Sequence, residues 1–137
     1  MLAAFALGAD GVQVGSRFAA SAESSGHPAF KQRIVEAADG DTFLTLKKVV
    51  PVRMIRNKFY RDVEALENRG GSTEELASLL GHGRSRRGMF EGDTEEGELE
   101  IGQVAGLIRE IKPAAEILRE MMDEFEAAKA QLSTLSF

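Results

Sequence analysis

Apolar residues recur at helical spacing in three separate parts of the chain. Each group repeats at intervals of three or four residues, which places its members on one face of an amphipathic helix. Charged residues occupy many of the positions between them, so each helix is expected to bury one face and expose the other. The three stripes are Phe30, Ile34, Val35 and Ala38; Ile55, Phe59, Val63 and Leu66; and Ile117, Met121, Phe125, Ala128 and Leu132.

Capping signals predict where several helices begin and end. Pro28 is typical of the first turn of a helix, and Gly70 is typical of the residue that follows one. Residues 72–75, Ser-Thr-Glu-Glu, form a capping-box sequence for another helix, which runs to Leu80.

The later part of the chain alternates between polar segments and apolar ones. A further helix is predicted over 102–111, and Pro113 breaks or restarts it. The basic segment 82–87 and the acidic segment 91–100 are predicted to be loops.

Short runs of β-prone residues predict a few strands. Residues 11–14, Gly-Val-Gln-Val, are bounded by glycines and indicate a short buried strand. Gly8 ends a helical segment just before them, and this helix–glycine–strand order is typical of a wound α/β fold. Two more strands are expected, over 42–46 and 49–52. Because the chain opens on the end of a helix, we expect it to be part of a longer protein.

Composition excludes several classes of function. The net charge of −5 argues against nucleic acid as a partner, because binding phosphates requires a basic face. The sequence has no cysteine and only two histidines, His27 and His82, so we expect no metal site and a cytoplasmic location. No stretch approaches the roughly 20 apolar residues that cross a bilayer, so a membrane partner is not expected.

The candidate chemistry lies in residues 8–18. A strand that ends in Gly15-Ser16 and leads into a polar turn presents backbone amides and a hydroxyl to a phosphate group, and glycine allows a close approach. By itself this pattern favours an ordinary buried strand and turn, because fold rules alone do not specify a ligand.

Five motifs in the same order resemble the nitronate monooxygenase family, formerly called 2-nitropropane dioxygenases, which includes the flavin-type enoyl-acyl-carrier-protein reductases. Together they cover nearly the whole chain. Any one of them is weak, but five in sequence are fairly specific. They are Ala6–Phe18, His27–Lys31, Pro51–Lys58, Arg87–Asp93 and Gly102–Ile108.

The resemblance implies an α/β fold, namely the C-terminal portion of an FMN-binding (β/α)₈ (TIM) barrel with a helical extension. In isolation such a portion would be mostly helical with a few short strands. The expected division is the last barrel strand and its helix over 1–39, a small strand and helix extension over 40–101, and C-terminal helices over 102–137. A complete barrel typically needs about 250 residues, more than the 137 present.

The resemblance also implies a cofactor and its binding residues. In the family, a glycine and a small hydroxyl residue after the last strand help to bind the FMN phosphate, and these roles fall on Gly15 and Ser16, where many relatives have threonine. The segment that contains Gln103 returns towards the flavin in such enzymes, so Gln103 is a further candidate neighbour of cofactor or substrate.

The implied activity is flavin-dependent oxidoreduction of a nitronate or an enoyl thioester, with NAD(P)H as a possible co-substrate. The family's catalytic histidine region has no counterpart here, so the catalytic residues are unknown and the chain alone is expected to be inactive. Its expected partners are another copy of itself or the rest of the barrel. The residues leave open which substrate applies, and whether the chain alone binds FMN.

Other interpretations remain open. The chain could be a non-catalytic helical module that binds a partner or serves a structural role. The arginines at 84, 86 and 87 could bind a phosphate-rich ligand, although a solvated loop is favoured. Arg53, Arg56 and Lys58 could contact an anion, although they fit the polar face of a structural element. His27 is expected to cap a helix and His82 to be solvated.

Overall fold

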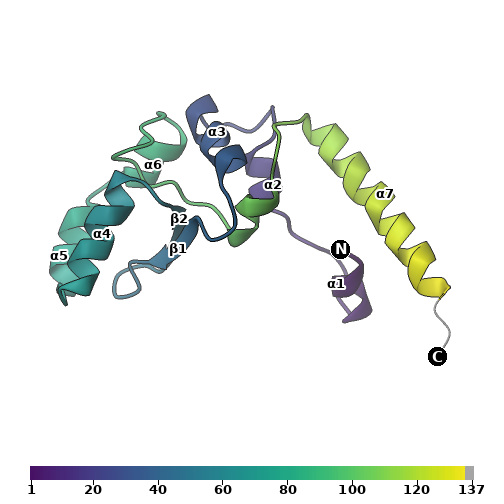
Figure 1. The fold of residues 1–137 in the computed structure, drawn as a ribbon, viewed down its shortest axis with the longest axis horizontal. Helices are drawn as coiled ribbons and strands as arrows, with labels where there is room; N and C mark the ends of the chain where they lie inside the picture. Colours follow the sequence, from purple (N-terminus) through teal and green to yellow (C-terminus); the bar gives the residue numbers. More distant parts are fainter. Residues whose placement is uncertain (135–137) are drawn as a thin grey trace.

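The computed structural model describes residues 1–134, which are mostly helical with one two-stranded sheet. Figure 1 shows α4 and α5 side by side at one end of the molecule, and α1 and α7 at the other. The elements are α1 (Leu2–Ala6), α2 (Ser16–Ala19), α3 (Pro28–Glu36), β1 (Thr42–Thr45), β2 (Val52–Ile55), α4 (Lys58–Asn68), α5 (Thr73–Leu80), α6 (Arg84–Met89), the 3₁₀ helix η1 (Gln103–Leu107) and α7 (Ala114–Ser133).

One hydrophobic core joins the hairpin to α4 and α5. β1 and β2 are antiparallel, with Thr42 opposite Ile55 and Thr45 opposite Val52. The predicted stripe of α4 faces this core, because its spacing brings three apolar side chains to one side of the helix. The buried residues of this core are Leu46, Met54, Phe59, Tyr60, Val63, Leu66 and Leu76.

A second core lies between α3, η1 and the segment 99–101. Ile55 donates a backbone hydrogen bond to Leu99, and Ile101 donates one to Arg53, so this segment lies along the free edge of β2. The two cores therefore share the hairpin, which holds the centre of the molecule together. The buried members of this core are Ala20, Phe30, Ile34, Ala37, Ile55, Leu99, Ile101, Ala105 and Ile108.

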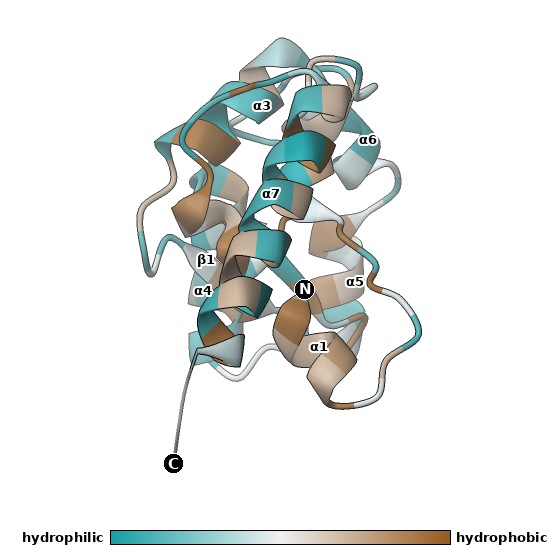
Figure 2. Ribbon diagram, turned by 90° about the vertical axis from the view of Figure 1, so that its right-hand side faces the viewer, coloured by the Kyte–Doolittle hydropathy of each residue, from teal (hydrophilic) through white to brown (hydrophobic). Residues whose placement is uncertain are grey.

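The pair formed by α1 and α7 is less well buried than the centre. Phe5 of α1 meets Phe125 of α7 edge to face, with ring centroids 5.7 Å apart. Of the residues in α7 only Ile117 is buried, whereas Leu118 and Met122 are exposed. Figure 2 shows apolar segments of α1 and α7 among polar ones at the surface. The predicted stripe of α7 is therefore only partly covered, and its last member, Leu132, is exposed.

Several helix predictions are confirmed. α5 runs from Thr73 to Leu80, and both hydrogen bonds of its capping box are present, Ser72 N to Glu75 Oε2 at 2.8 Å and Glu75 N to Ser72 Oγ at 3.2 Å. α3 begins at Pro28 as expected. Gly8 has a φ of +92° just after α1, as a glycine that ends a helix does.

Other element boundaries were wrong. The predicted loop 82–87 is largely the helix α6, which forms because its backbone packs against Glu98. The second strand lies at Val52–Ile55 rather than 49–52, and Ile55 belongs to it instead of α4. Of the helix predicted over 102–111, only η1 forms, because packing against Ala38 and the second core decides this segment.

The predicted strand at 11–14 is absent. These residues are mainly exposed, have neither helical nor strand structure, and Val12 is 40% exposed. A strand requires backbone partners on a neighbouring strand, and residues 1–134 provide none beside this segment. The sequence pattern is present without the sheet that would make it a strand.

None of the helices described within residues 1–134 is both long and apolar enough to span a membrane.

Candidate functional site

Ser16 is held by a contact with a segment far along the chain. It is the first residue of α2, and its Oγ accepts a hydrogen bond from the backbone N–H of Gly102 at 3.1 Å. A Cβ on Gly102 would lie 2.7 Å from that oxygen, so glycine is what allows the approach. Because the hydroxyl oxygen accepts this bond, its own hydrogen remains available to donate to a ligand.

Gly15 immediately precedes Ser16, and nothing in the described chain requires it to be glycine. Its φ of −97° and ψ of −72° are accessible to any residue. A Cβ built on it would meet no atom within 4 Å. The space that a side chain would occupy is therefore open, and a group approaching from outside could use it.

An open hollow of about 490 Å³ lies beside Gly15 and Ser16. One wall comes from α2, and the other from the start of β2 and the segment that runs beside it. The hollow thus brings together residues from three distant parts of the sequence. Its lining consists of Gly15, Ser16, Ala19, Pro51, Val52, Arg53, Glu100, Ile101 and Gly102.

Gln103 follows Gly102 but lines a different hollow. That second hollow has a volume of about 360 Å³ and lies against η1, with Asp39, Val104 and Leu107 around it. Gln103 itself is exposed. The structure therefore brings Gly15 and Ser16 together with Gly102 and Arg53, and leaves the side chain of Gln103 in a separate place.

The three cations of the motif 51–58 have different surroundings. Lys58 pairs with Asp62 at 3.1 Å and Glu96 at 2.6 Å, and hydrogen bonds to these acids raise its pKa. The Arg56 guanidinium lies over the Phe43 ring, 4.4 Å from its centroid. Only Arg53 lines the hollow beside Ser16.

The acidic segment contains a buried carboxyl group. Glu98 is only 6% exposed, and burial, followed by repulsion from Glu100, raises its pKa to about 7. Arg84 opposes this shift but does not cancel it. Glu98 is therefore a group whose charge changes near neutral pH inside the fold.

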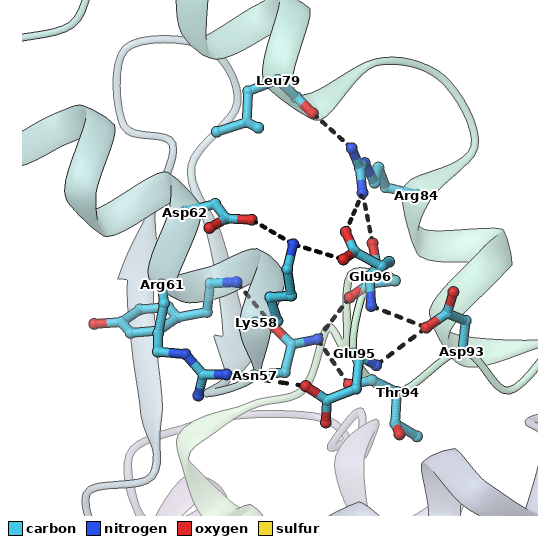
Figure 3. Close-up of polar contacts among 12 residues, drawn as sticks. Asn57, Lys58, Arg61, Asp62, Leu79, Arg84, Asp93, Thr94, Glu95 and Glu96 are labelled. Atoms are coloured by element: carbon cyan, nitrogen blue, oxygen red, sulfur yellow. Dashed lines mark hydrogen bonds and ion pairs between the residues drawn. The ribbon is translucent and has the colours of Figure 1, made fainter.

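A network centred on Asn57 ties the acidic segment to α4 (Figure 3). Asn57 is 2% exposed; its side chain accepts from Tyr60 N at 2.9 Å and donates to the carbonyls of Thr94 and Gly97 at 2.9 and 2.8 Å. The Asp93 carboxylate accepts hydrogen bonds from the backbone N–H groups of Glu95 and Glu96. The hydrogen bond from Glu96 is the main cause that lowers the pKa of Asp93. The motifs at 51–58 and 87–93 thus meet in a structural network.

The sequence analysis missed this network because it predicted the acidic segment 91–100 to be a loop, without contacts to α4. Asparagine is a favoured N-cap residue, and Asn57 directly precedes α4. The predicted stripe began at Ile55, however, which placed Asn57 inside the expected helix rather than at its start. No local pattern, however, indicates that the amide of the same side chain reaches carbonyl groups about 40 residues away.

The arginines of α6 are engaged within the chain. Arg84 donates to the carbonyls of Leu79 and Glu96 and lies 4.6 Å from the centroid of Phe59. Arg86 pairs with Glu91, and Arg87 with Asp93. These arginines belong to a helix rather than to the predicted loop, whereas the side chains of Arg86 and Arg87 are solvated as predicted. All three have partners within the chain that a phosphate ligand would have to displace.

The histidines occupy the places expected of them. His27 is the N-cap of α3, and its Nδ1 accepts from the Ala29 N–H at 3.1 Å. His82 is exposed. Among residues 1–134, no group of three or more histidine, cysteine or acidic side chains is arranged to hold a metal ion.

Comparisons with known proteins agree on one family. The family model described as nitronate monooxygenase matches residues 1–124. A probable nitronate monooxygenase of Bacillus subtilis is 47% identical over 66 residues, which cover 47% of this chain and 19% of that protein. A nitronate monooxygenase of Metarhizium robertsii is 33% identical over 141 residues, which cover 91% of this chain and 38% of that protein.

The three-dimensional similarity has the same extent. FabK from Thermotoga maritima matches with a TM-score of 0.87 and 41% identity, over 96% of this chain and 42% of that chain. This chain therefore spans less than half the length of these relatives. The solved relatives are (β/α)₈ barrels, and the fold here is that of part of such a barrel with a helical extension. The chain belongs to the nitronate monooxygenase family, whose members are flavin-dependent oxidoreductases.

Proposed function

We propose that this chain supplies the phosphate-binding corner and the C-terminal helical part of an FMN-dependent oxidoreductase. The observation that carries the proposal is that an open Cβ position at Gly15 lies next to an available hydroxyl group at Ser16. The Ser16 hydroxyl is held by Gly102 with its proton free, and the Cβ position of Gly15 is open.

The residues present fit a phosphomonoester such as that of FMN. Such a group accepts several hydrogen bonds and needs close approach to the backbone, which the hydroxyl of Ser16 and the bare Cα of Gly15 allow. When bound, the flavin would supply the redox chemistry, and the chain would hold its phosphate end in place. Gln103 lies in the neighbouring hollow and is proposed only as a group near cofactor or substrate.

The reaction we propose is that of the family: oxidation of a nitronate, or reduction of an enoyl thioester with NAD(P)H as reductant. The names of the relatives, nitronate monooxygenase and FabK, support these two. The catalytic residues are not assigned among residues 1–137. We therefore propose that turnover requires barrel segments other than residues 1–137, with which this chain associates. We also propose that the chain associates with copies of itself and acts in the cytoplasm.

Titration of the ¹⁵N-labelled chain with FMN tests the binding part of this proposal. FMN should shift the amide resonances of Gly15, Ser16 and Gly102, whereas riboflavin, which lacks the phosphate, should not. Ser16→Thr keeps the hydroxyl and should preserve the response, whereas Ser16→Ala should reduce it. If FMN leaves all three amides unshifted, the proposal fails, and the non-catalytic helical module becomes the better description.

A further inference from the structure

Arg53 differs from every other cation near the Ser16 hollow. Its Nη1 donates to the carbonyl and the hydroxyl of Thr42, at 2.8 and 3.2 Å. These bonds fix one arm of the guanidinium fork against β1. Among residues 1–134, no carboxylate lies within 4.0 Å of this guanidinium, so its charge is not neutralised by a described ion pair.

The other candidates have partners elsewhere. Lys58 pairs with two acids, and Arg56 stacks on aromatic rings. Arg17, one residue after Ser16, donates to the carbonyl of Glu110 instead of lining the hollow. Arg53 is thus the one arginine or lysine among the residues that line the hollow beside Gly15 and Ser16.

We propose that Arg53 is an anion-binding residue of this hollow, and that it binds the same phosphomonoester as Ser16 from the opposite wall. The part of the fork not held by Thr42 retains N–H donors, and a guanidinium suits a phosphate because two donors can meet two oxygens. The identity of the anion rests on the proposed function, whereas the presence of an anion site beside Arg53 does not.

Glu100 allows the direction of the electrostatic effect on anion binding to be tested. Glu100 lines the same hollow, and its negative charge would repel an anion bound there. An uncompensated arginine is what allows this hollow to accept an anion despite that charge. Glu100→Gln should therefore tighten anion binding, and Arg53→Gln should weaken it.

The experiment follows the Nε–Hε resonance of Arg53 in the ¹⁵N-labelled chain during titration with FMN, riboflavin or inorganic phosphate. FMN and inorganic phosphate should shift the Arg53 resonance together with the Ser16 amide, and riboflavin should shift neither. Arg53→Gln should weaken FMN binding at least about tenfold, the loss expected for a hydrogen bond to a charged group. Arg53→Lys, which keeps the charge but loses the fork, should weaken it less.

Arg56→Gln is the matched control, because it removes a guanidinium from the same hairpin but from outside the hollow. It should leave the phosphate response unchanged. If FMN shifts Ser16 but Arg53→Gln binds as well as the unaltered chain, the role of Arg53 is overturned and the proposed function stands. If FMN shifts nothing while inorganic phosphate shifts Arg53, the flavin assignment fails and the anion site stands. If neither ligand shifts Arg53, the inference fails.

Discussion

Two glycines of this molecule, Gly88 in α6 and Gly15 beside Ser16, differ in whether the fold requires them. In the α6 region, a Cβ on Gly88 would lie 2.5 Å from the Glu98 carbonyl oxygen and 2.9 Å from its nitrogen. At the Ser16 corner, a Cβ on Gly15 would meet nothing within 4 Å. The fold itself explains the first glycine and leaves the second unexplained. A glycine that the fold does not require is a candidate for contact with a ligand.

The largest expected effect comes from Gly88→Ala. The added methyl group would overlap the backbone of Glu98, which cannot move like a flexible side chain, so we expect a loss of about 3 kcal/mol in the free energy of unfolding. Urea denaturation measures it. Gly15→Ala is the matched control and should change stability by less than about 0.5 kcal/mol. Equal losses in the two variants would remove the distinction between the regions.

Asn57→Ala should have the next largest effect. It removes the N-cap of α4 and leaves the carbonyls of Thr94 and Gly97 without their buried donor. The expected loss is about 2–3 kcal/mol, from a lost cap and an unsatisfied buried group together. Thermal unfolding measures it, with Asn68→Ala, an exposed asparagine at the end of the same helix, as the control. A loss no greater than that of the control would contradict the network.

The pH dependence of stability should report on Glu98. Its pKa is about 7 in the folded chain against an ordinary value of 4.5, so the folded state binds the proton more tightly. Its contribution to stability is therefore complete below about pH 4.5 and is lost as the pH rises through 7. Unfolding free energies measured from pH 5 to 8 should fall by on the order of 2 kcal/mol from this group. Glu98→Gln should flatten that decline, and an unchanged slope would refute the assignment.

Ser16→Ala should have the smallest effect on stability. It removes one half-buried hydrogen bond from Gly102, worth about 1 kcal/mol. Its effect on FMN binding should be larger in proportion, because the hydroxyl would lose a ligand contact as well. Comparing urea denaturation with an FMN titration on this variant separates the two roles. A variant that loses stability but keeps its FMN response would place Ser16 with the structural residues.

The difference between confirmed and failed predictions follows from the range of the interactions. The capping box of Ser72 and Glu75 and the stripe of α4 depend on residues three or four positions apart, so the sequence shows them directly. The strand at 11–14 failed because it needs neighbours that residues 1–134 do not include. The loop predicted at 82–87 became α6 because contacts with Glu98 stabilise a helix that polar composition alone did not indicate.

The sequence by itself determined the helical stripes, the caps and the family resemblance, and through the resemblance it led to the prediction that Gly15 and Ser16 bind a phosphate. Tertiary structure alone decided that Gly102 holds the Ser16 hydroxyl, that Arg53 lines the hollow beside Ser16, and that Gln103 lines another. The physical reason is chain separation, because Ser16, Arg53 and Gly102 meet only when two cores that share the hairpin have formed. The folded chain thereby adds a second wall to the site predicted at Gly15 and Ser16, and this wall carries Arg53, which forms no ion pair with residues 1–134.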